Sequence, residues 1–309
     1  MYNLASELST IIGKVNSIEP IRSGLSGAQV SAVSAASGEY VLKSQPHETD
    51  DNFWSQYRLI LKRASEHQIA PEVVYIDDAA RAVLSVRVHG VPLQVALRGE
   101  ARDAAIASVL AQIRAVHAID PAGITERNPL DYARAIWEAQ RQRPDFPSWA
   151  KAAEREFADV ASALERDPRR VVSHNDVNPG NILWDGTRAW IVDWDAAALG
   201  HPYYDFATFA TFLDLNAEAG WDLMAQQQQS PLDDDARATF TALRRLVALA
   251  IGYSFVSGVP DVASLAPTRA DAPTLAECRA ALRSGALDLQ TVEGRGRYGF
   301  AMLRAGISS

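Results

Sequence analysis

Two neighbouring stretches decide the fold of this chain, VVSHNDVNPGNILW at residues 171–184 and IVDWD at residues 191–195. Each contains a short apolar run, and the residues between them carry an Asp-Gly turn signal. The order predicts a loop, a strand, a tight turn and a second strand. Such a hairpin returns Asp193 to the side of Asn181 and Asp176, so three polar side chains are expected around one point.

These three side chains have the chemistry that phosphoryl transfer needs. Asp176 can accept a proton from a hydroxyl group, while Asn181 and Asp193 offer hard oxygen ligands of the kind that Mg²⁺ prefers when phosphates also bind it. A single Asp or Asn is more often a loop-former. The spacing HxDxxxxN, followed by an apolar run that ends in Asp, is instead typical of a kinase catalytic loop. His174 fits an architectural role in such a loop rather than that of a base.

The segment resembles the catalytic loop of the aminoglycoside phosphotransferase and choline/ethanolamine kinase superfamily, which are small-molecule kinases with a protein-kinase-like fold. The resemblance continues through GHPYYDFA at residues 200–207. It implies an α+β fold with two lobes: a small nucleotide-binding lobe at residues 1–90 and a large, mostly helical lobe with the catalytic hairpin at residues 91–309. It also implies that Asp205 is structural and helps to hold the catalytic loop.

The N-terminal residues predict a nucleotide clamp built on strands. Three apolar segments follow one another, with the small-residue loop SGLSG between the first two, at residues 18–22, 28–34 and 39–43. Glycines let a loop approach phosphates closely, although a Gly-Ser stretch is equally typical of a plain hairpin loop. The candidate phosphate contacts in this loop are Ser23, Gly24, Ser26 and Gly27. Lys43 ends the third strand, where the lysine of the kinase fold holds the phosphates of ATP.

A helix is predicted at residues 50–67, and it departs from the kinase pattern. Kinases usually place a Glu in the middle of this helix to pair with the strand lysine, but this chain has Gln56 near that place. A Gln could donate or accept hydrogen bonds without neutralising an ammonium group. Two further strands, at residues 73–76 and 82–86, would complete a five-stranded antiparallel sheet, and residues 87–93 are interpreted as the hinge.

Composition is compatible with this architecture. The 309 residues are 48% hydrophobic, which is enough for a sizeable core. The Ala-rich run at residues 101–119 is interrupted by charges and predicts an amphipathic helix rather than a membrane span. Residues 1–14 show no secretory signal, and one cysteine, Cys278, excludes an intrachain disulfide. We therefore expect a cytoplasmic protein without a membrane span.

The net charge of −8 argues against a nucleic-acid partner and suits a small cationic, hydroxylated substrate. Acids and aromatics are frequent at residues 203–255, where they could contact an ammonium group. The alternative is that the acids cap helices and the aromatics fill the core of the helical lobe. Residues 226–231 are expected to form an exposed loop. Helices are predicted at residues 101–119, 130–141, 148–165, 206–216, 236–252, 274–283 and 292–309.

Small differences within the superfamily bear on the acceptor. Asn175, the Gly24-Leu25-Ser26 turn and the Asp193-Trp194-Asp195 triplet resemble choline/ethanolamine kinases more than aminoglycoside kinases, although choline kinases commonly carry Glu where Asp195 stands. Asp195 is either a second metal ligand or a helix cap.

The leading hypothesis is an ATP- and Mg²⁺-dependent kinase acting on the hydroxyl of a small amino-alcohol such as choline or ethanolamine. An aminoglycoside or another amine-bearing alcohol is the alternative acceptor. The missing helix Glu motivates a third hypothesis, a nucleotide-binding pseudokinase. The sequence fixes neither the acceptor nor the oligomeric state.

Overall fold

The computed structural model describes residues 4–21, 27–46 and 48–307 of the chain. The chain forms two compact units, one of Met1–Glu126 with Val171–Leu199 and one of Arg127–Arg170 with Gly200–Ser309. The first unit joins the N-terminal sheet to the predicted catalytic hairpin. The predicted lobes, 1–90 and 91–309, were defined by function, as a nucleotide-binding and a catalytic part, and not by contacts. They stay a prediction.

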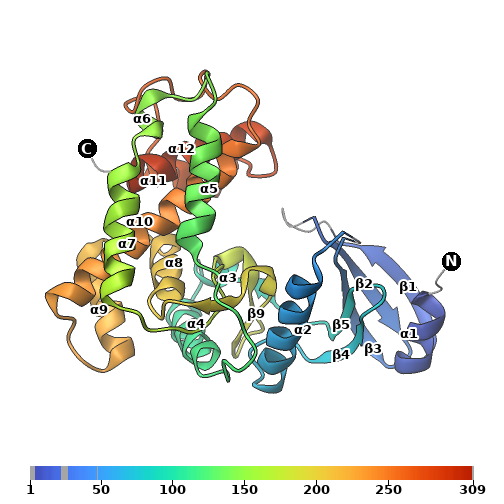
Figure 1. Cartoon of the computed structure of the whole chain (residues 1–309). Coiled ribbons are helices and arrows are strands. Elements are labelled where there is room, and N and C mark those ends of the chain that lie inside the picture. The colour runs from blue at the N-terminus through green and yellow to red at the C-terminus, as the bar shows by residue number, and fades with distance from the viewer. Residues whose placement is uncertain (1–3, 22–26, 47, 308–309) are drawn as a thin grey trace. The chain divides into compact units, whose positions relative to one another are not determined.

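A five-stranded antiparallel sheet forms the N-terminal part of the first unit, as predicted (Figure 1). Its strand order is β1-β2-β3-β5-β4, with β1 Val15–Pro20, β2 Gln29–Ala35, β3 Gly38–Ser44, β4 Val73–Asp77 and β5 Ala82–Val86. A short helix that was not predicted, α1 (Leu4–Ile12), packs Leu8 and Ile12 into a core with strand residues such as Val33 and Leu84. These two helix residues are four apart and therefore share one face.

Helix α2 (Asp51–Glu66) confirms the predicted helix and is capped by Asp50, whose side chain accepts the backbone N–H groups of Asn52 and Phe53. Its buried residues repeat with helical spacing at Trp54, Tyr57, Ile60, Leu61 and Ala64. They share one core cluster with Val172, Ile191 and Trp194 of the motif region. The helix is thereby packed against the segment that carries the candidate site.

The predicted loop, strand, turn and strand are confirmed by β7 (Val171–Ser173), β8 (Ile182–Trp184) and β9 (Ala189–Ile191). Strands β8 and β9 pair with Ile182 opposite Ile191, and the N–H of Val192 donates to the carbonyl of Asn181 at 2.9 Å. Within the predicted hinge, residues 91–92 form a short strand, β6 (Val91–Pro92), that pairs with β8. A last strand, β10 (Ala198–Gly200), pairs with β7.

The α-helices after α2 follow in the two units. The first unit adds α3 (Leu93–Ala96) and α4 (Arg102–His117). The second unit contains α5 Pro129–Arg141, α6 Ser148–Lys151, α7 Glu154–Arg166, α8 Tyr204–Phe212, α9 Ala217–Gln228, α10 Asp234–Ser257, α11 Leu275–Ser284 and α12 Val292–Gly306. By length and composition alone α10 could cross a membrane, but 67% of its most apolar window is buried inside the structure. Its contacts with α5, α7, α8 and α12 are those of a core helix.

Several helix predictions are corrected: the helix expected at residues 206–216 ends at Phe212, and α9 was not predicted. The helix expected at residues 148–165 is broken between α6 and α7, because Tyr253 donates to the carbonyl of Ala150 at 2.8 Å and Trp137 donates to that of Lys151 at 2.9 Å. Those carbonyls would otherwise accept the next helical N–H groups. The Gln-rich residues 226–228, expected in a loop, end helix α9, where glutamine has good helix propensity.

Candidate active site

The catalytic-loop residues lie between β7 and a 3-10 helix at Pro179–Asn181. Asn178 donates to Oδ1 of Asp176 at 2.9 Å, and Asn181 donates to Oδ2 at 2.7 Å. The side chain of Asn178 also accepts the N–H of Gly180 and so caps the 3-10 helix. Both carboxylate oxygens of Asp176 are therefore held by amides from the same turn, which fixes the direction of the carboxylate.

His174 is fully buried and architectural in its contacts. Its Nδ1 accepts the backbone N–H of Asp176 at 3.3 Å, while Nε2 lies 3.2 Å from the carbonyl of Val192. These two partners assign the proton to Nε2. The ring also meets Trp194 edge-on, with 4.7 Å between ring centroids. The histidine thus joins the loop to the end of the hairpin, which is an architectural role.

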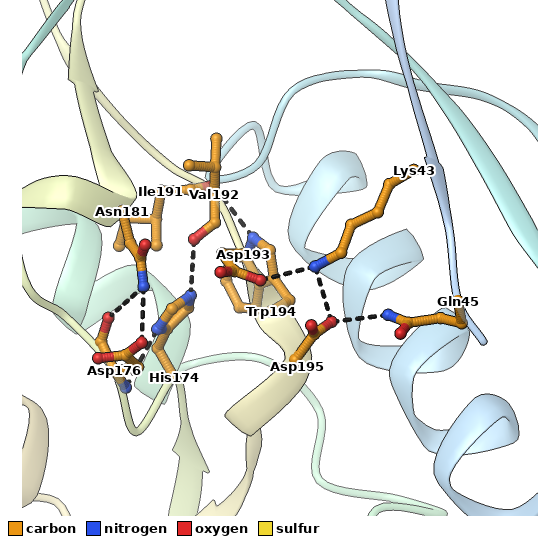
Figure 2. A network of polar contacts seen from close by, with 10 residues as sticks. All are labelled: Lys43, Gln45, His174, Asp176, Asn181, Ile191, Val192, Asp193, Trp194 and Asp195. Carbon is orange, nitrogen blue, oxygen red and sulfur yellow. Dashed lines mark hydrogen bonds and ion pairs between the residues drawn. The ribbon is translucent and has the colours of Figure 1, made fainter. Parts of the chain in front are cut away.

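Asp193 follows the hairpin in the left-handed region, with φ 64°. This conformation is uncommon outside glycine but tolerated by Asp and Asn. Next to it, Trp194 is buried and donates to the carbonyl of Ile191 at 3.0 Å. The anchored indole leaves Asp193 and Asp195 directed together toward strand β3, as Figure 2 shows.

Lys43 of β3 forms ion pairs with both of these carboxylates (Figure 2). Its Nζ lies 2.6 Å from Oδ1 of Asp193 and 2.8 Å from Oδ1 of Asp195. Gln45 donates to the same oxygen of Asp195 at 2.9 Å. The structure thus brings together residues that are about 150 positions apart in the sequence and places Lys43 beside the hairpin end that also carries Asn181.

Gln56 has other partners than Lys43. Its Oε1 accepts from the backbone and hydroxyl groups of Thr125, and its Nε2 donates to the carbonyl of Ala197 at 3.3 Å. The next residue, Tyr57, instead presents its ring to the ammonium group of Lys43, 5.6 Å from the ring centroid. Helix α2 therefore offers Lys43 an aromatic face rather than an amide.

The other predicted residues are placed as follows. Asp195 lies inside the 3-10 helix Trp194–Ala196, so it is not the cap of that helix. Asp205 is fully buried in the first turn of α8, and its predicted role in holding the loop stays a prediction. Gly27 has φ 73°, a conformation that favours glycine. Ser23, Gly24 and Ser26 lie outside the described residues.

Burial sets the electrostatics of the cluster. It raises the pKa of the Asp176 carboxyl above its ordinary value, and the nearby Asp193 acts in the same direction. Burial likewise raises the pKa of Asp195, an effect that Lys43 opposes. The pKa of Tyr57 is raised by burial and by the two acids that flank Lys43. In Figure 2 the carboxylates of Asp193 and Asp195 meet the ammonium group of Lys43, whereas that of Asp176 lies apart from it and is bound to Asn181.

The donor chemistry of this cluster fits Mg²⁺. The amide nitrogen of Asn181 is bound to Asp176, which leaves its amide oxygen for a ligand, and Lys43 contacts one of the two oxygens of Asp193. Within the described ranges, no group of three or more His, Cys, Asp and Glu side chains is arranged to hold a metal. Few protein ligands are usual for Mg²⁺, which takes its remaining ligands from phosphates and water.

Sequence reasoning missed three supporting residues, namely Gln45, Tyr57 and Asn178. Strand alternation could have found Gln45, because residues two apart in an extended segment share a face. Tyr57 is adjacent to Gln56, the position considered for the helix partner, and an aromatic ring facing the ammonium group was not considered there. Asn178 lies inside the motif itself, in an Asn-Pro-Gly turn where an Asx cap is expected.

The acids and aromatics at residues 203–255 are mainly structural. Tyr203, Phe209 and Tyr253 are buried in the core. Asp233 caps α10 by accepting the N–H of Ala236 at 2.8 Å, and Asp214 pairs with Arg279. The structural interpretation of this region therefore holds for these residues, and they give no support to a cation site.

The chain was compared with known proteins. Among the curated proteins searched, none matches the sequence. A choline/ethanolamine kinase family protein from Mesorhizobium loti is 18% identical, with a TM-score of 0.64 over 97% of this chain and 99% of that one. The choline kinase LicA from Streptococcus pneumoniae is 14% identical, with a TM-score of 0.59 over 82% and 90% of the two chains. Identities this low show a shared fold.

A third similar structure is a thermostable mutant of the aminoglycoside phosphotransferase APH(4)-Ia in a ternary complex with ADP and hygromycin B. It is 19% identical, with a TM-score of 0.60 over the whole of both chains.

The phosphotransferase enzyme family model matches residues 17–245, a stretch that includes the sheet, Lys43 and the catalytic hairpin. It covers well over half of the chain, and the similar structures share the sheet and the helical part. The chain therefore belongs to the phosphotransferase enzyme family, as a small-molecule phosphotransferase with a protein-kinase-like α+β fold.

Proposed function

We propose that this enzyme transfers the γ-phosphoryl group of ATP to the hydroxyl of a small amino-alcohol such as choline or ethanolamine. The observation that carries the reaction is the cluster in Figure 2, where a half-buried carboxylate, two oxygen donors for a metal and a strand lysine lie in one unit. Each of these groups has a part in phosphoryl transfer. Their intact set argues against a pseudokinase.

Asp176 is the proposed catalytic base. Its carboxylate is held by Asn178 and Asn181 and is made more basic by burial, so it can orient the acceptor hydroxyl and take its proton. Asn181 and Asp193 would hold Mg²⁺, which neutralises charge on the nucleotide phosphates. Lys43 and the loop that contains Gly27 would bind those phosphates.

Acceptor chemistry is the finer part of the proposal. The net charge of −8 favours a cationic substrate, and several similar structures are named choline or ethanolamine kinases. The similar structure that holds hygromycin B makes an aminoglycoside the competing acceptor. The single buried cysteine suits a cytoplasmic enzyme that draws on cellular ATP.

An acceptor screen tests the proposal. Purified enzyme is given ATP and Mg²⁺ with choline, ethanolamine or a panel of aminoglycosides, and ADP release is measured by a coupled assay. We expect turnover with an amino-alcohol, and its loss on chelation of the metal. Turnover with aminoglycosides alone, together with growth protection against them, would establish the competing acceptor. ATP binding without turnover on any acceptor would establish the pseudokinase.

A further inference from the structure

Lys43 lacks the partner that a kinase helix usually supplies. The acidic residues of α2 are Asp51 and Glu66, at its first and last positions, and Asp51 pairs with Arg81 at 2.5 Å. Gln56 is bound to Thr125 and the carbonyl of Ala197. Helix α2 therefore gives the ammonium group no counter-charge, and the position of Lys43 must be fixed from elsewhere.

Two carboxylates contact Lys43, but they are not equivalent. Asp193 is the proposed metal ligand, so its carboxylate must serve Mg²⁺ during the reaction. Asp195 has a 20% exposed side chain, against 33% for Asp193, and Oδ1 of Asp195 accepts from Lys43 and Gln45 together. The contact that can persist when Asp193 binds a metal is therefore the one between Lys43 and Asp195.

Gln45 holds Asp195 from the position directly after β3, the strand that carries Lys43. The two residues are two apart and share a face of the extended chain, and the backbone N–H of Gln45 still pairs with the carbonyl of Arg81 at 3.0 Å. Gln45 is buried, and its amide lies 2.9 Å from Asp195. The carboxylate thus accepts hydrogen bonds from Lys43 of β3 and from Gln45 directly after it, while the ring of Tyr57 lies 5.6 Å from the ammonium group.

We propose that Asp195, braced by Gln45, is the positioning residue for Lys43 and replaces the missing helix carboxylate in this enzyme. The inference rests on the proposed function and assigns Asp195 a part other than metal ligand or helix cap. In this arrangement Asp195 acts through Lys43. Its removal leaves Lys43 with Asp193 as its one carboxylate partner, so the ammonium group is held less firmly for the nucleotide phosphates and turnover falls.

The first test reads the position of Lys43 without requiring activity. Nucleotide-free protein is trace-labelled with an amine-acylating reagent, and peptide mass spectrometry compares Lys43 with the exposed Lys62 of the same unit. Asp195→Asn should raise the relative labelling of Lys43 by about tenfold, as for the loss of one good ion-pair partner. Gln45→Ala should raise it less, and Asp195→Glu should restore most of the protection. Unchanged labelling in Asp195→Asn and Gln45→Ala overturns the proposal.

The second test is a double-mutant cycle on turnover. In the wild-type background Asp195→Asn should lower kcat by about tenfold, with little change in the acceptor KM or in the Mg²⁺ concentration for half-maximal activity. In the Lys43→Ala background the same substitution should change kcat by less than about twofold, because its partner is already gone. Asp103→Asn, which removes an exposed carboxylate of the same unit, is the control and should match wild type.

The outcomes separate this inference from the proposed function. Additive losses in the cycle, or a raised Mg²⁺ requirement in Asp195→Asn, would show that Asp195 acts independently of Lys43 and would refute the positioning role. A wild-type enzyme that transfers phosphate to no acceptor would refute the proposed function, while the labelling result would still decide whether Asp195 holds Lys43.

Discussion

At the scale of single residues, Asp176 should separate chemistry from binding. The Asp176→Asn variant keeps the size of the side chain, but it loses the proton-accepting charge and exchanges one of two acceptor oxygens for a donor. Turnover should fall by a factor on the order of 10²–10⁴, the usual effect of losing a general base. Nucleotide affinity, measured by calorimetry, should stay close to that of wild type. Wild-type turnover in this variant would remove Asp176 from its proposed role.

We expect Asn178 to support turnover through its hydrogen bond to Asp176 rather than through its capping of the 3-10 helix. Asn178→Ala removes both the 2.9 Å hydrogen bond to Oδ1 of Asp176 and the acceptor for Gly180. We expect turnover to fall roughly 10- to 100-fold, as for a hydrogen bond to a charged group. Asn178→Ser is the matched control, because serine can still cap the 3-10 helix. Recovery of steady-state turnover in the Ser variant would show that only the cap matters.

The sequence predicted the residues of the motif but not their supporting contacts. Asp176, Asn181 and Asp193 could be placed because a tight turn and a two-residue strand period fix their relation locally. The contact between Lys43 and Asp195 joins positions 152 apart, and no local pattern encodes it. The Gln at position 56 made a helix partner for Lys43 look absent, whereas the partners come from the hairpin and from Tyr57.

At the scale of elements, periodicity predicted most helices and the whole sheet, and it failed where side chains compete for backbone groups. The break between α6 and α7 depends on Trp137 and Tyr253. These side chains belong to other helices of the second unit and donate to the carbonyls at the break. A local window cannot contain such distant donors. Helix α1 was not predicted, and neither was α9, which occupies residues between a predicted helix and a predicted loop.

Helices α10 and α12 should tolerate no added side chain where they cross. A Cβ on Gly252 would lie 2.7 Å from Cδ2 of Leu303 and 3.0 Å from the carbonyl of Gly299. Overpacking costs about 1–3 kcal/mol, and the better helix propensity of alanine returns up to about 1 kcal/mol. With the full propensity gain, Gly252→Ala should therefore lower the free energy of unfolding by up to about 2 kcal/mol in urea titrations.

The matched control for this crossing is Gly258→Ala, at the end of the same helix. A Cβ there meets nothing within 4 Å, and its backbone φ of −86° suits any residue. Its urea midpoint should equal that of wild type within error. Equal midpoints for Gly252→Ala and wild type would show that the crossing can relax.

At the scale of the whole molecule, acid stability should depend on one buried histidine of the second unit. His201 is 4% exposed; its Nδ1 accepts the N–H of Tyr203, and its Nε2 lies 3.0 Å from Asp167. Burial lowers the pKa of His201 to about 4, against the opposing effect of Asp167. Hydrogen bonds from Arg169 lower the pKa of Asp167 to about 2, so this carboxylate stays charged through the same range.

The sign of the pH dependence follows from these values. Between the ordinary histidine pKa of 6.5 and the folded value of about 4, the unfolded chain binds the proton more tightly, so acid favours unfolding. The contribution of neutral, buried His201 to the free energy of unfolding is complete above pH 6.5 and is lost as the pH falls toward 4. It amounts to roughly 3 kcal/mol at most. Asp167 contributes to acid sensitivity only below its ordinary pKa of 3.8 and cannot explain a loss of stability above that pH.

Urea midpoints at pH 7, 6 and 5 (roughly the span in which histidine titrates) should therefore decline steeply in the wild type and in the exposed-site control His89→Gln. In His201→Gln they should decline less. Parallel declines in all three proteins would exclude His201 as the source, because only the His201→Gln variant lacks the buried group that must take up a proton on unfolding.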